Sequence, residues 1–316
     1  MKRAYSEKMD RLYVLFSALQ KAVRWCEVND ARYFARELIE MGMSGAPLNR
    51  LMLIAAEDVG LADPTLLKYV GDCFDTFEAM LKKYKTTRSK VSVSAFPEIC
   101  AAIDRAAIAS ALCYKSRVLP MLSFATLYDI YKKEDFSQSA GEYGNRFRAA
   151  IQRQDEKEAA YYAYLLALFL DSEDSVFEIV QQESKTRNTE LIVEWTHEYM
   201  NRGKEKLVLA GIVSLLCRDV NYPHGEYCDQ VSAWLSEPIK KATIPDRAYD
   251  MHTGLGKKRG RGLKHFFDEA GSVKNERFLN DWEEPGREAY LEARDKGLAR
   301  ASKVIEATKK SLKKAS

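Results

Sequence analysis

The sequence predicts an all-α protein in which pairs of amphipathic helices form a bundle or helical-pair array. Apolar residues recur at spacings of three and four over most segments between breaker residues, as they do on one face of a helix. The one alternation typical of a strand, at residues 91–95, is short and isolated. With 316 residues, of which 46% are hydrophobic and 30% charged, the chain is long enough for about two globular domains.

The composition indicates a soluble protein of the cytoplasm. No apolar run reaches the roughly 18 residues that a membrane-spanning helix needs. Residues 1–8 contain no apolar segment typical of a signal peptide. The six cysteines form no CxxC pair and most lie among apolar helical residues, which predicts reduced thiols in the core.

Residues 8–41 predict two amphipathic helices. Leu12, Leu15, Leu19 and Val23 mark the buried face of the first helix. We expect a loop at residues 28–30, followed by a second helix up to residue 41.

Residues 48–70 predict two helices joined by an acidic corner. The first helix runs into Glu57-Asp58-Val59-Gly60, where glycine allows a tight turn. We expect the second helix to begin at Asp63-Pro64, because aspartate is a favoured N-cap and proline is tolerated at the first helical position. The residues predicted to form this structural corner or subunit contact are Glu57, Asp58, Gly60, Asp63 and Pro64.

Glu57 and Asp58 have two interpretations. They could act as an acid–base or metal-binding pair. Adjacent helical positions point about 100° apart, however, so the two carboxylates do not converge by themselves. We favour a structural role, in which Asp58 or Asp63 caps backbone N–H groups and Glu57 meets a basic side chain such as Arg50 or Arg36.

This corner resembles the signature of a known family. Residues 56–64, AEDVGLADP, are similar to a run in the C-terminal region of the RarA/MgsA/WRNIP1 family of AAA+ ATPases, which are related to clamp loaders and act at stalled replication forks. Residues 16–24 and 31–38 extend the likeness upstream, and residues 106–128 extend it weakly downstream, so it covers roughly the first 130 residues. The resemblance implies a helical region that forms homo-tetramers and contacts fork DNA or replication proteins.

That family hydrolyses ATP, but the ATPase motifs are missing here. A Walker A loop requires GxxxxGK followed by Ser or Thr. Lys258 instead follows Gly256-Lys257, Met251 replaces the first glycine, and Arg259 breaks a GxGxxG pattern. We therefore expect the helical region without its ATPase domain, with no catalytic residues and no cofactor. The four histidines are scattered, so no metal site is expected either.

A polar segment at residues 135–144 predicts a domain boundary. It separates a helical domain at 1–134 from a second one at 145–243, and residues 244–316 follow as a basic C-terminal segment. Arg218-Asp219-Val220 resembles Glu57-Asp58-Val59, and other runs of the second domain resemble the first. This indicates a degenerate duplication. The alternative, that any two amphipathic helices look alike, stays open.

Positive charge is concentrated toward the C-terminus. Residues 254–316 contain 16 Lys/Arg against 10 Asp/Glu, a net charge of +6, whereas residues 1–253 contain 33 against 36, a net charge of −3. Residues 254–262 hold four glycines among four fixed positive charges, which disfavours a helix. We predict a basic loop that contacts nucleic-acid phosphates. Its predicted DNA-binding residues are Lys257, Lys258, Arg259, Arg261, Lys264 and His265.

His252, His265 and Phe266 would add stacking on unpaired bases. The alternative for the basic loop is that it is solvated and packs against the acidic body of the protein.

Three functions stay open, and the first is favoured. It is a non-catalytic protein of DNA replication or repair that forms homo-oligomers and contacts DNA, forked or single-stranded, or a clamp-loader-like ATPase. The second is a helical-repeat adaptor that binds protein and no nucleic acid. The third is a hydrolase that combines Glu57 and Asp58 with His252 and His265, and it requires these residues to meet in space.

Overall fold

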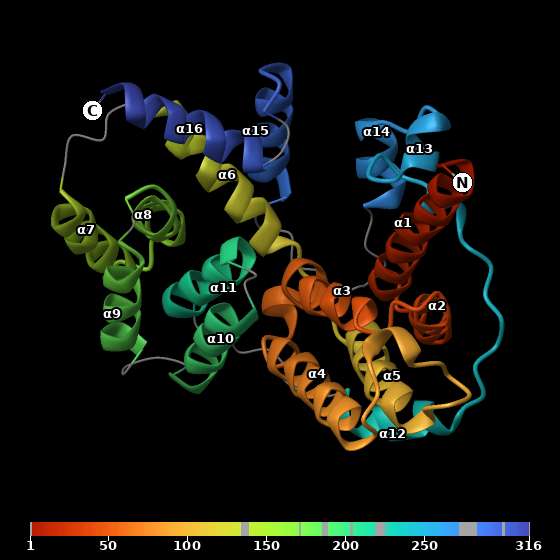
Figure 1. Cartoon of the computed structure of the whole chain (residues 1–316). Coiled ribbons are helices and arrows are strands. Elements are labelled where there is room, and N and C mark those ends of the chain that lie inside the picture. Colours follow the sequence, from red (N-terminus) through yellow and green to blue (C-terminus); the bar gives the residue numbers. More distant parts are fainter. Residues whose placement is uncertain are drawn as a thin grey trace. The chain divides into compact units, whose positions relative to one another are not determined.

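The computed structural model of the chain describes residues 2–133, 139–170, 172–184, 189–202, 205–218, 225, 227–271, 283–298 and 301–315 (Figure 1). Within these ranges the regular structure is helical and no β-strand is formed, so the predicted all-α fold is confirmed. None of the helices in these ranges is long and apolar enough to cross a membrane.

The chain forms two compact units, each built from two segments. Unit 1 comprises Met1–Lys115 and Pro223–Phe278, and unit 2 comprises Ser116–Tyr222 and Leu279–Ser316. This division differs from the segments 1–134, 145–243 and 244–316 that the sequence indicates. The reason is that the chain returns: the helix at 254–258 packs against the first helix, and the helix at 283–295 packs against the helix at 118–132.

In unit 1, α1 (Lys2–Arg24) and α2 (Val28–Glu40) pack against each other and against α5 (Pro97–Leu112). The predicted apolar faces are buried, including Leu15, Leu19 and Leu38. The turn between α1 and α2 is formed by residues 25–27, before the predicted loop at residues 28–30. Cys26 has a φ of 58° and residues 28–30 already belong to α2, so the predicted loop at 28–30 is wrong.

The remaining elements of unit 1 are short helices and turns around this group. They are α3 (Ala46–Ile54), the π-helix η1 (Ala55–Val59), the 3₁₀ helices η2 (Gly60–Ala62), η3 (Arg88–Lys90) and η5 (Asp246–Ala248), α4 (Leu66–Lys83), α12 (Cys228–Ser236), α13 (Gly254–Lys258), α14 (Leu263–His265) and the π-helix η6 (Phe266–Ala270).

The acidic corner exists, but its second helix begins later than predicted. Gly60 has a φ of 47°, a backbone region open to glycine, and it ends η1 as expected. The first residue of α4 is Leu66 and its N-cap is Thr65, so the predicted start at Asp63-Pro64 is wrong. The Asp63 carboxylate accepts hydrogen bonds from the Thr65 hydroxyl (2.6 Å) and from the backbone N–H of Thr65 (3.3 Å) and of Gly225 (3.1 Å). Asp63 therefore closes a turn before the helix instead of capping it.

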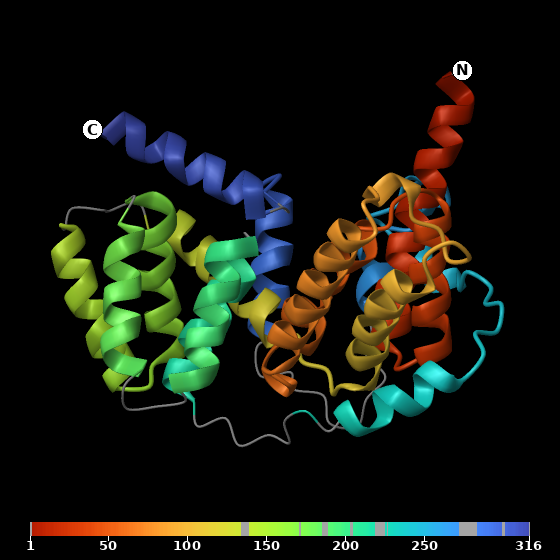
Figure 2. The same ribbon diagram turned by 60° about the horizontal axis from the view of Figure 1, so that its bottom comes forward.

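Unit 2 is built around the apolar helix α6 (Val118–Lys132). Helices α8, α11, α15 and α16 pack against α6, and α7 to α11 form a group of neighbouring helices (Figure 2). Their bounds are α7 (Ala140–Gln152), α8 (Glu156–Phe169), α9 (Glu173–Glu183), α10 (Thr189–Arg202), α11 (Glu205–Cys217), α15 (Glu283–Asp295) and α16 (Ala301–Ala315).

Helix α7 begins inside the segment predicted as a boundary. Ser139 and Glu142 form a capping box, in which the Ser139 hydroxyl accepts from the Glu142 N–H and the Glu142 carboxylate accepts from the Ser139 N–H. Part of the predicted second acidic corner, residues 219–220, lies outside the described residues.

The six cysteines form no disulfide bond. Cys73, Cys100, Cys113 and Cys217 are buried, as predicted for most of them, whereas Cys26 and Cys228 are exposed.

Candidate functional site: a polar pocket in unit 1

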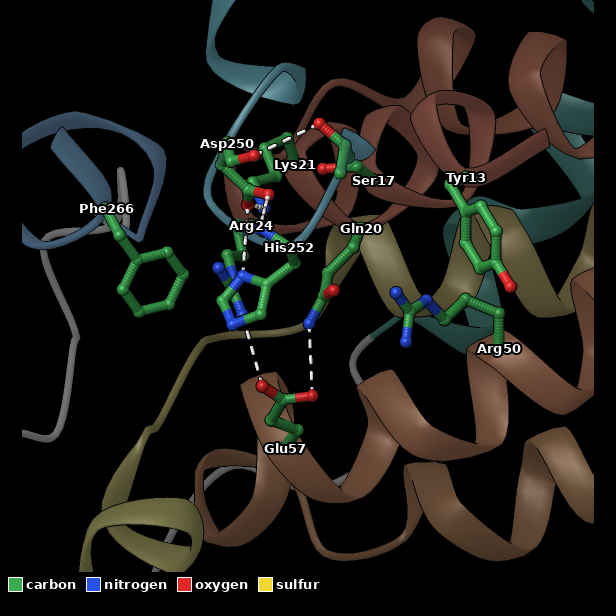
Figure 3. A pocket seen from close by; sticks show the side chains of 11 residues that line it. Tyr13, Ser17, Gln20, Lys21, Arg24, Arg50, Glu57, Asp250, His252 and Phe266 are labelled. Carbon is green, nitrogen blue, oxygen red and sulfur yellow. Dashed lines mark hydrogen bonds and ion pairs between the residues drawn. The ribbon is translucent and has the colours of Figure 1, made fainter. Parts of the chain in front are cut away.

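Unit 1 contains a polar pocket of about 210 Å³ where α1, the acidic corner and the segment after α12 meet (Figure 3). The acidic corner contributes Glu57, and α3 contributes Arg50. The segment after α12 contributes Asp250, His252, Thr253 and Phe266. The fold thus brings the predicted corner and the start of the predicted basic region to one place.

One side of α1 supplies the rest of the lining. Its residues are Tyr13, Ser17, Gln20, Lys21 and Arg24. These positions share a face because an α-helix repeats every 3.6 residues. None of the five is among the sites predicted from the sequence. The sequence does contain a signal for these residues, because they form a polar stripe along a helix whose opposite stripe is apolar.

Arg24 and Asp58 form a buried ion pair beneath the pocket. The Arg24 side chain is 1% exposed and that of Asp58 is fully buried, and their Nε and Oδ1 atoms lie 2.5 Å apart. Gln20 donates to Asp58 (2.8 Å) and to Glu57 (3.1 Å). Burial lowers the pKa of Arg24, but the charges of Asp58 and Glu57 outweigh it and raise that pKa above its usual value. Arg24 therefore stays charged and tied to the corner.

This arrangement corrects the predicted partners of the corner. Glu57 meets Arg24 (Nη2–Oε1, 3.4 Å), whereas Arg36 pairs with Asp104 at 2.6 Å. Asp58 accepts from side chains, and backbone N–H groups are bound by Asp63 instead. Asp63 is one of the two carboxylates expected to bind backbone N–H groups and does so, whereas Glu57 meets Arg24 and Gln20 in place of the expected Arg50 or Arg36.

Lys21 and Asp250 form a second buried pair, joining α1 to the segment after α12. Their side chains are 3% and 0% exposed, and Lys21 Nζ donates to Asp250. Burial, followed by the charge of Arg24, lowers the pKa of Lys21 to about 8, against the opposing effect of Asp250. Burial alone would raise the pKa of Asp250, but the hydrogen bond from His252 and the charge of Lys21 lower it far below its usual value. At neutral pH the pair is ionised.

The Asp250 carboxylate makes the stability of unit 1 depend on pH in the acidic range. Because its folded-state pKa is lowered, Asp250 contributes stability that is present above its unfolded value near 3.8 and lost as the pH falls toward the folded value. We expect the loss of stability caused by Asp250→Asn to be about 2 kcal/mol smaller at pH 2 than at pH 5. Chemical unfolding across this pH range, followed by amide exchange in α1, measures it. A pH-independent difference would contradict this account.

The predicted basic loop contains a short helix. Thr253 caps α13, since its hydroxyl accepts from the N–H of Gly256 at 2.9 Å. Gly256 is buried, and a Cβ there would lie 2.0 Å from the carbonyl oxygen of Asp250. The prediction that the glycines prevent a helix is therefore wrong at residues 254–258. At Gly256 the missing side chain permits close packing.

The predicted DNA-binding residues lie on α13 and in the residues after it, and none of them lines the pocket. Lys257, Lys258, Arg259 and Lys264 are exposed. Lys258 pairs with Asp10 at 3.1 Å and Arg259 with Asp246 at 3.2 Å. The largely buried Arg261 also pairs with Asp246, and His265 lies 3.4 Å from Glu269.

The four residues of the hydrolase hypothesis meet only in part. Glu57 and His252 both line the pocket. Asp58 is held by Arg24 and Gln20, and His265 lies beside Glu269 on the following turn. In the described part of the chain, no three His, Cys, Asp or Glu side chains gather in a group that could hold a metal ion.

Comparison with known proteins confirms the resemblance that the sequence indicates. The chain is 40% identical over 76 residues to replication-associated recombination protein A of Escherichia coli K12, which is 23% of this chain and 17% of that protein. The Haemophilus influenzae protein of the same name is 38% identical over 76 residues, again 23% and 17%. The Bacillus subtilis protein is 38% identical over 69 residues, or 22% and 16%.

The similarity is shorter than the roughly 130 residues that the motifs indicate. The chain spans 16–17% of the length of these curated relatives. No family model and no solved structure matches the chain.

Proposed function

We propose that this chain is a non-catalytic protein of replication-associated recombination that oligomerises and contacts DNA through its basic segment, residues 254–264. The observation that carries the proposal is the 38–40% identity to proteins named replication-associated recombination protein A. By the same resemblance, we propose a homo-tetramer in the cytoplasm whose partner is a clamp-loader-like AAA+ ATPase or another replication protein. Glu57 and Asp58 have no catalytic role in this proposal, and it needs no cofactor or metal.

The exposed cations around α13 support DNA contact. Lys258 and Arg259 are 68% and 46% exposed, and their partners Asp10 and Asp246 are 24% and 68% exposed. Such exposed pairs contribute at most about 1 kcal/mol each. A DNA phosphate can therefore replace Asp10 or Asp246 as partner with little loss of stability, while the release of counterions favours binding.

Charge reversal tests the DNA contact. We expect Lys257→Glu/Lys258→Glu to weaken binding of a forked oligonucleotide at least about tenfold at ~100 mM salt. The slope of log K against log[salt] should fall by about 1.5, because each lost phosphate contact removes about 0.7–0.9. Fluorescence anisotropy over a salt series measures both, and light scattering on the same samples gives the subunit number.

The matched control is Lys82→Glu/Lys90→Glu, which reverses two exposed lysines elsewhere in unit 1. Its affinity for DNA should equal that of the unchanged protein. Absence of binding at ~50 mM salt, or equal weakening by both variants, would contradict the assignment of DNA contact to the basic segment.

The adaptor remains the second candidate, favoured by a different feature. An apolar groove of about 430 Å³ lies between α9 and α10 in unit 2, and Val193 at its edge is 58% exposed. An exposed apolar surface of this kind is typical of protein contacts. Purified protein that retains a bound protein and no nucleic acid, judged from absorbance at 260 and 280 nm, would favour the adaptor.

A further inference from the structure

Two buried hydrogen-bond donors of the pocket have no acceptor among the described residues. Ser17 is 4% exposed and its Oγ atom has no hydrogen-bond partner. The Nε atom of Arg50 is also buried and without a partner. Buried polar groups in native proteins are nearly always hydrogen-bonded. The two donors are therefore available to the acceptor atoms of a molecule that enters the pocket.

The carboxylates of the pocket accept hydrogen bonds from other groups and none from Ser17 Oγ or Arg50 Nε in the described structure. Glu57 accepts from Gln20 and Arg24, and Asp250 accepts from Lys21 and from the backbone N–H of His252. Each positive side chain, in contrast, retains capacity to donate. An ammonium group carries three N–H bonds and a guanidinium five. In the described structure Lys21 donates one hydrogen bond, to Asp250.

The donors of Arg50 and Ser17 suit an oxyanion with several acceptor atoms, and a phosphate group has this chemistry. Burial lowers the pKa of Arg50, against the opposing charges of Glu57 and Asp58, and the positive charge of Arg24 lowers it further. Glu57 remains 24% exposed at the pocket, so an anion must lie away from it. A phosphate carried on a larger neutral group meets this condition better than a bare anion does.

Aromatic side chains at the pocket supply contacts for such a group. His252 and Phe266 are in edge-to-face contact with ring centroids 4.8 Å apart. Figure 3 shows Phe266 at the opposite side of the pocket from Arg50 and Tyr13, with Gln20 and His252 between them. A volume of about 210 Å³ equals roughly seven water molecules at ~30 Å³ each. This exceeds what a single phosphate needs and leaves room for a flat ring.

We infer that the pocket binds a nucleotide, with its phosphate at Ser17 and Arg50 and its base against His252 and Phe266. The nucleotide is either a free mononucleotide or the phosphorylated end of a DNA strand. The strand-end form rests on the proposed DNA function, whereas the mononucleotide form does not. The basic segment lies outside the pocket lining, so the two sites can be altered separately.

The probes are dAMP, deoxyadenosine, and single-stranded oligonucleotides with a phosphate or a hydroxyl at the 5′ or 3′ end. By calorimetry we expect dAMP to bind the full chain at least about tenfold more tightly than deoxyadenosine, because hydrogen bonds from charged donors to the phosphate contribute at least that factor. If a strand end is the ligand, the phosphorylated oligonucleotide should bind at least about tenfold more tightly than the hydroxyl form.

The test variant is Ser17→Ala/Arg50→Gln, which should weaken dAMP binding at least about tenfold. It removes Ser17 Oγ and Arg50 Nε, which have no hydrogen-bond partner in the described structure, and also the contact of the Arg50 guanidinium with the Phe16 ring at 5.9 Å. Circular dichroism verifies that the variant keeps its fold. The control is Arg105→Gln, an exposed arginine of α5 outside the pocket, which should leave dAMP binding unchanged.

The outcomes separate the pocket from the proposed function. If dAMP binds and its binding depends on Ser17 and Arg50, nucleotide binding at the pocket is supported. If in addition no oligonucleotide binds, only the proposed DNA contact is contradicted. A second outcome would overturn nucleotide binding at the pocket and still support DNA contact. In it, dAMP does not bind, and oligonucleotides bind through Lys257 and Lys258 with the same affinity whether or not their end is phosphorylated. Equal dAMP affinity in the unchanged protein and in Ser17→Ala/Arg50→Gln also overturns it.

Discussion

Asp58→Ala is expected to lower the free energy of unfolding of unit 1 by about 3–5 kcal/mol, the range seen when one partner of a buried ion pair is removed. The variant leaves the Arg24 guanidinium, 1% exposed, without its closest counter-charge. The remaining contact, from Arg24 Nη2 to Glu57, is longer at 3.4 Å, and Glu57 is 24% exposed. Denaturant unfolding, with amide exchange in α1 and α3 to assign the loss to unit 1, measures the effect.

Asp246→Ala is the matched control for Asp58→Ala. Asp246 also pairs with arginines, Arg259 and Arg261, but its side chain is 68% exposed. We expect a loss below about 1 kcal/mol, because water screens exposed pairs. If both variants lost a similar amount of stability, burial would not be the reason for the large contribution of the Arg24–Asp58 pair to the stability of unit 1. Asp58→Asn should fall between them, since the amide can still accept from Gln20.

Gly256→Ala is expected to destabilise unit 1 by about 3 kcal/mol, at the upper end of the range for overpacking. The added Cβ would lie 2.0 Å from the carbonyl oxygen of Asp250. The carbonyl carbon and the amide nitrogen of Asp250 would also lie within 2.7 Å of that Cβ. These are backbone atoms, which cannot relieve the overlap by a change of rotamer as a side chain can. The variant should also displace Asp250 from Lys21, and thermal unfolding with amide exchange at residues 250–258 measures both effects.

Gly262→Ala provides the comparison within the same segment. A Cβ at Gly262 would meet no atom within 4 Å, so we expect a change within about 0.5 kcal/mol. If Gly256→Ala were as stable as Gly262→Ala, the backbone of Asp250 could move away from α13 without loss of stability, contrary to the packing described.

Much of the fold could be predicted because its signals are local. Leu15, Leu19 and Leu38 recur at helical spacing and are buried, and Gly60 takes the positive φ that the acidic corner requires. The exact turns could not be predicted as well. The turn at Cys26 adopts a positive φ in a residue that gives no turn signal, and Asp63 binds Gly225, which is distant in the sequence.

The basic segment shows the limit of composition as a guide. Its glycines indicate a loop, because glycine in a helix loses more backbone freedom than alanine does. The Thr253 cap and the close contact of Gly256 with Asp250 outweigh that penalty. Its charges are visible in the sequence, but their pairing with Asp10 and Asp246 is not.

The sequence by itself determined the helical class, the acidic corner and the resemblance to replication-associated recombination proteins, because helical periodicity and short motifs depend on neighbouring residues. The tertiary structure alone decided the pocket. Its ion pairs join residues 34 positions apart, Arg24 and Asp58, and 229 positions apart, Lys21 and Asp250. Which charges become partners depends on which helix faces are buried against each other, and burial is what makes those charges require a partner.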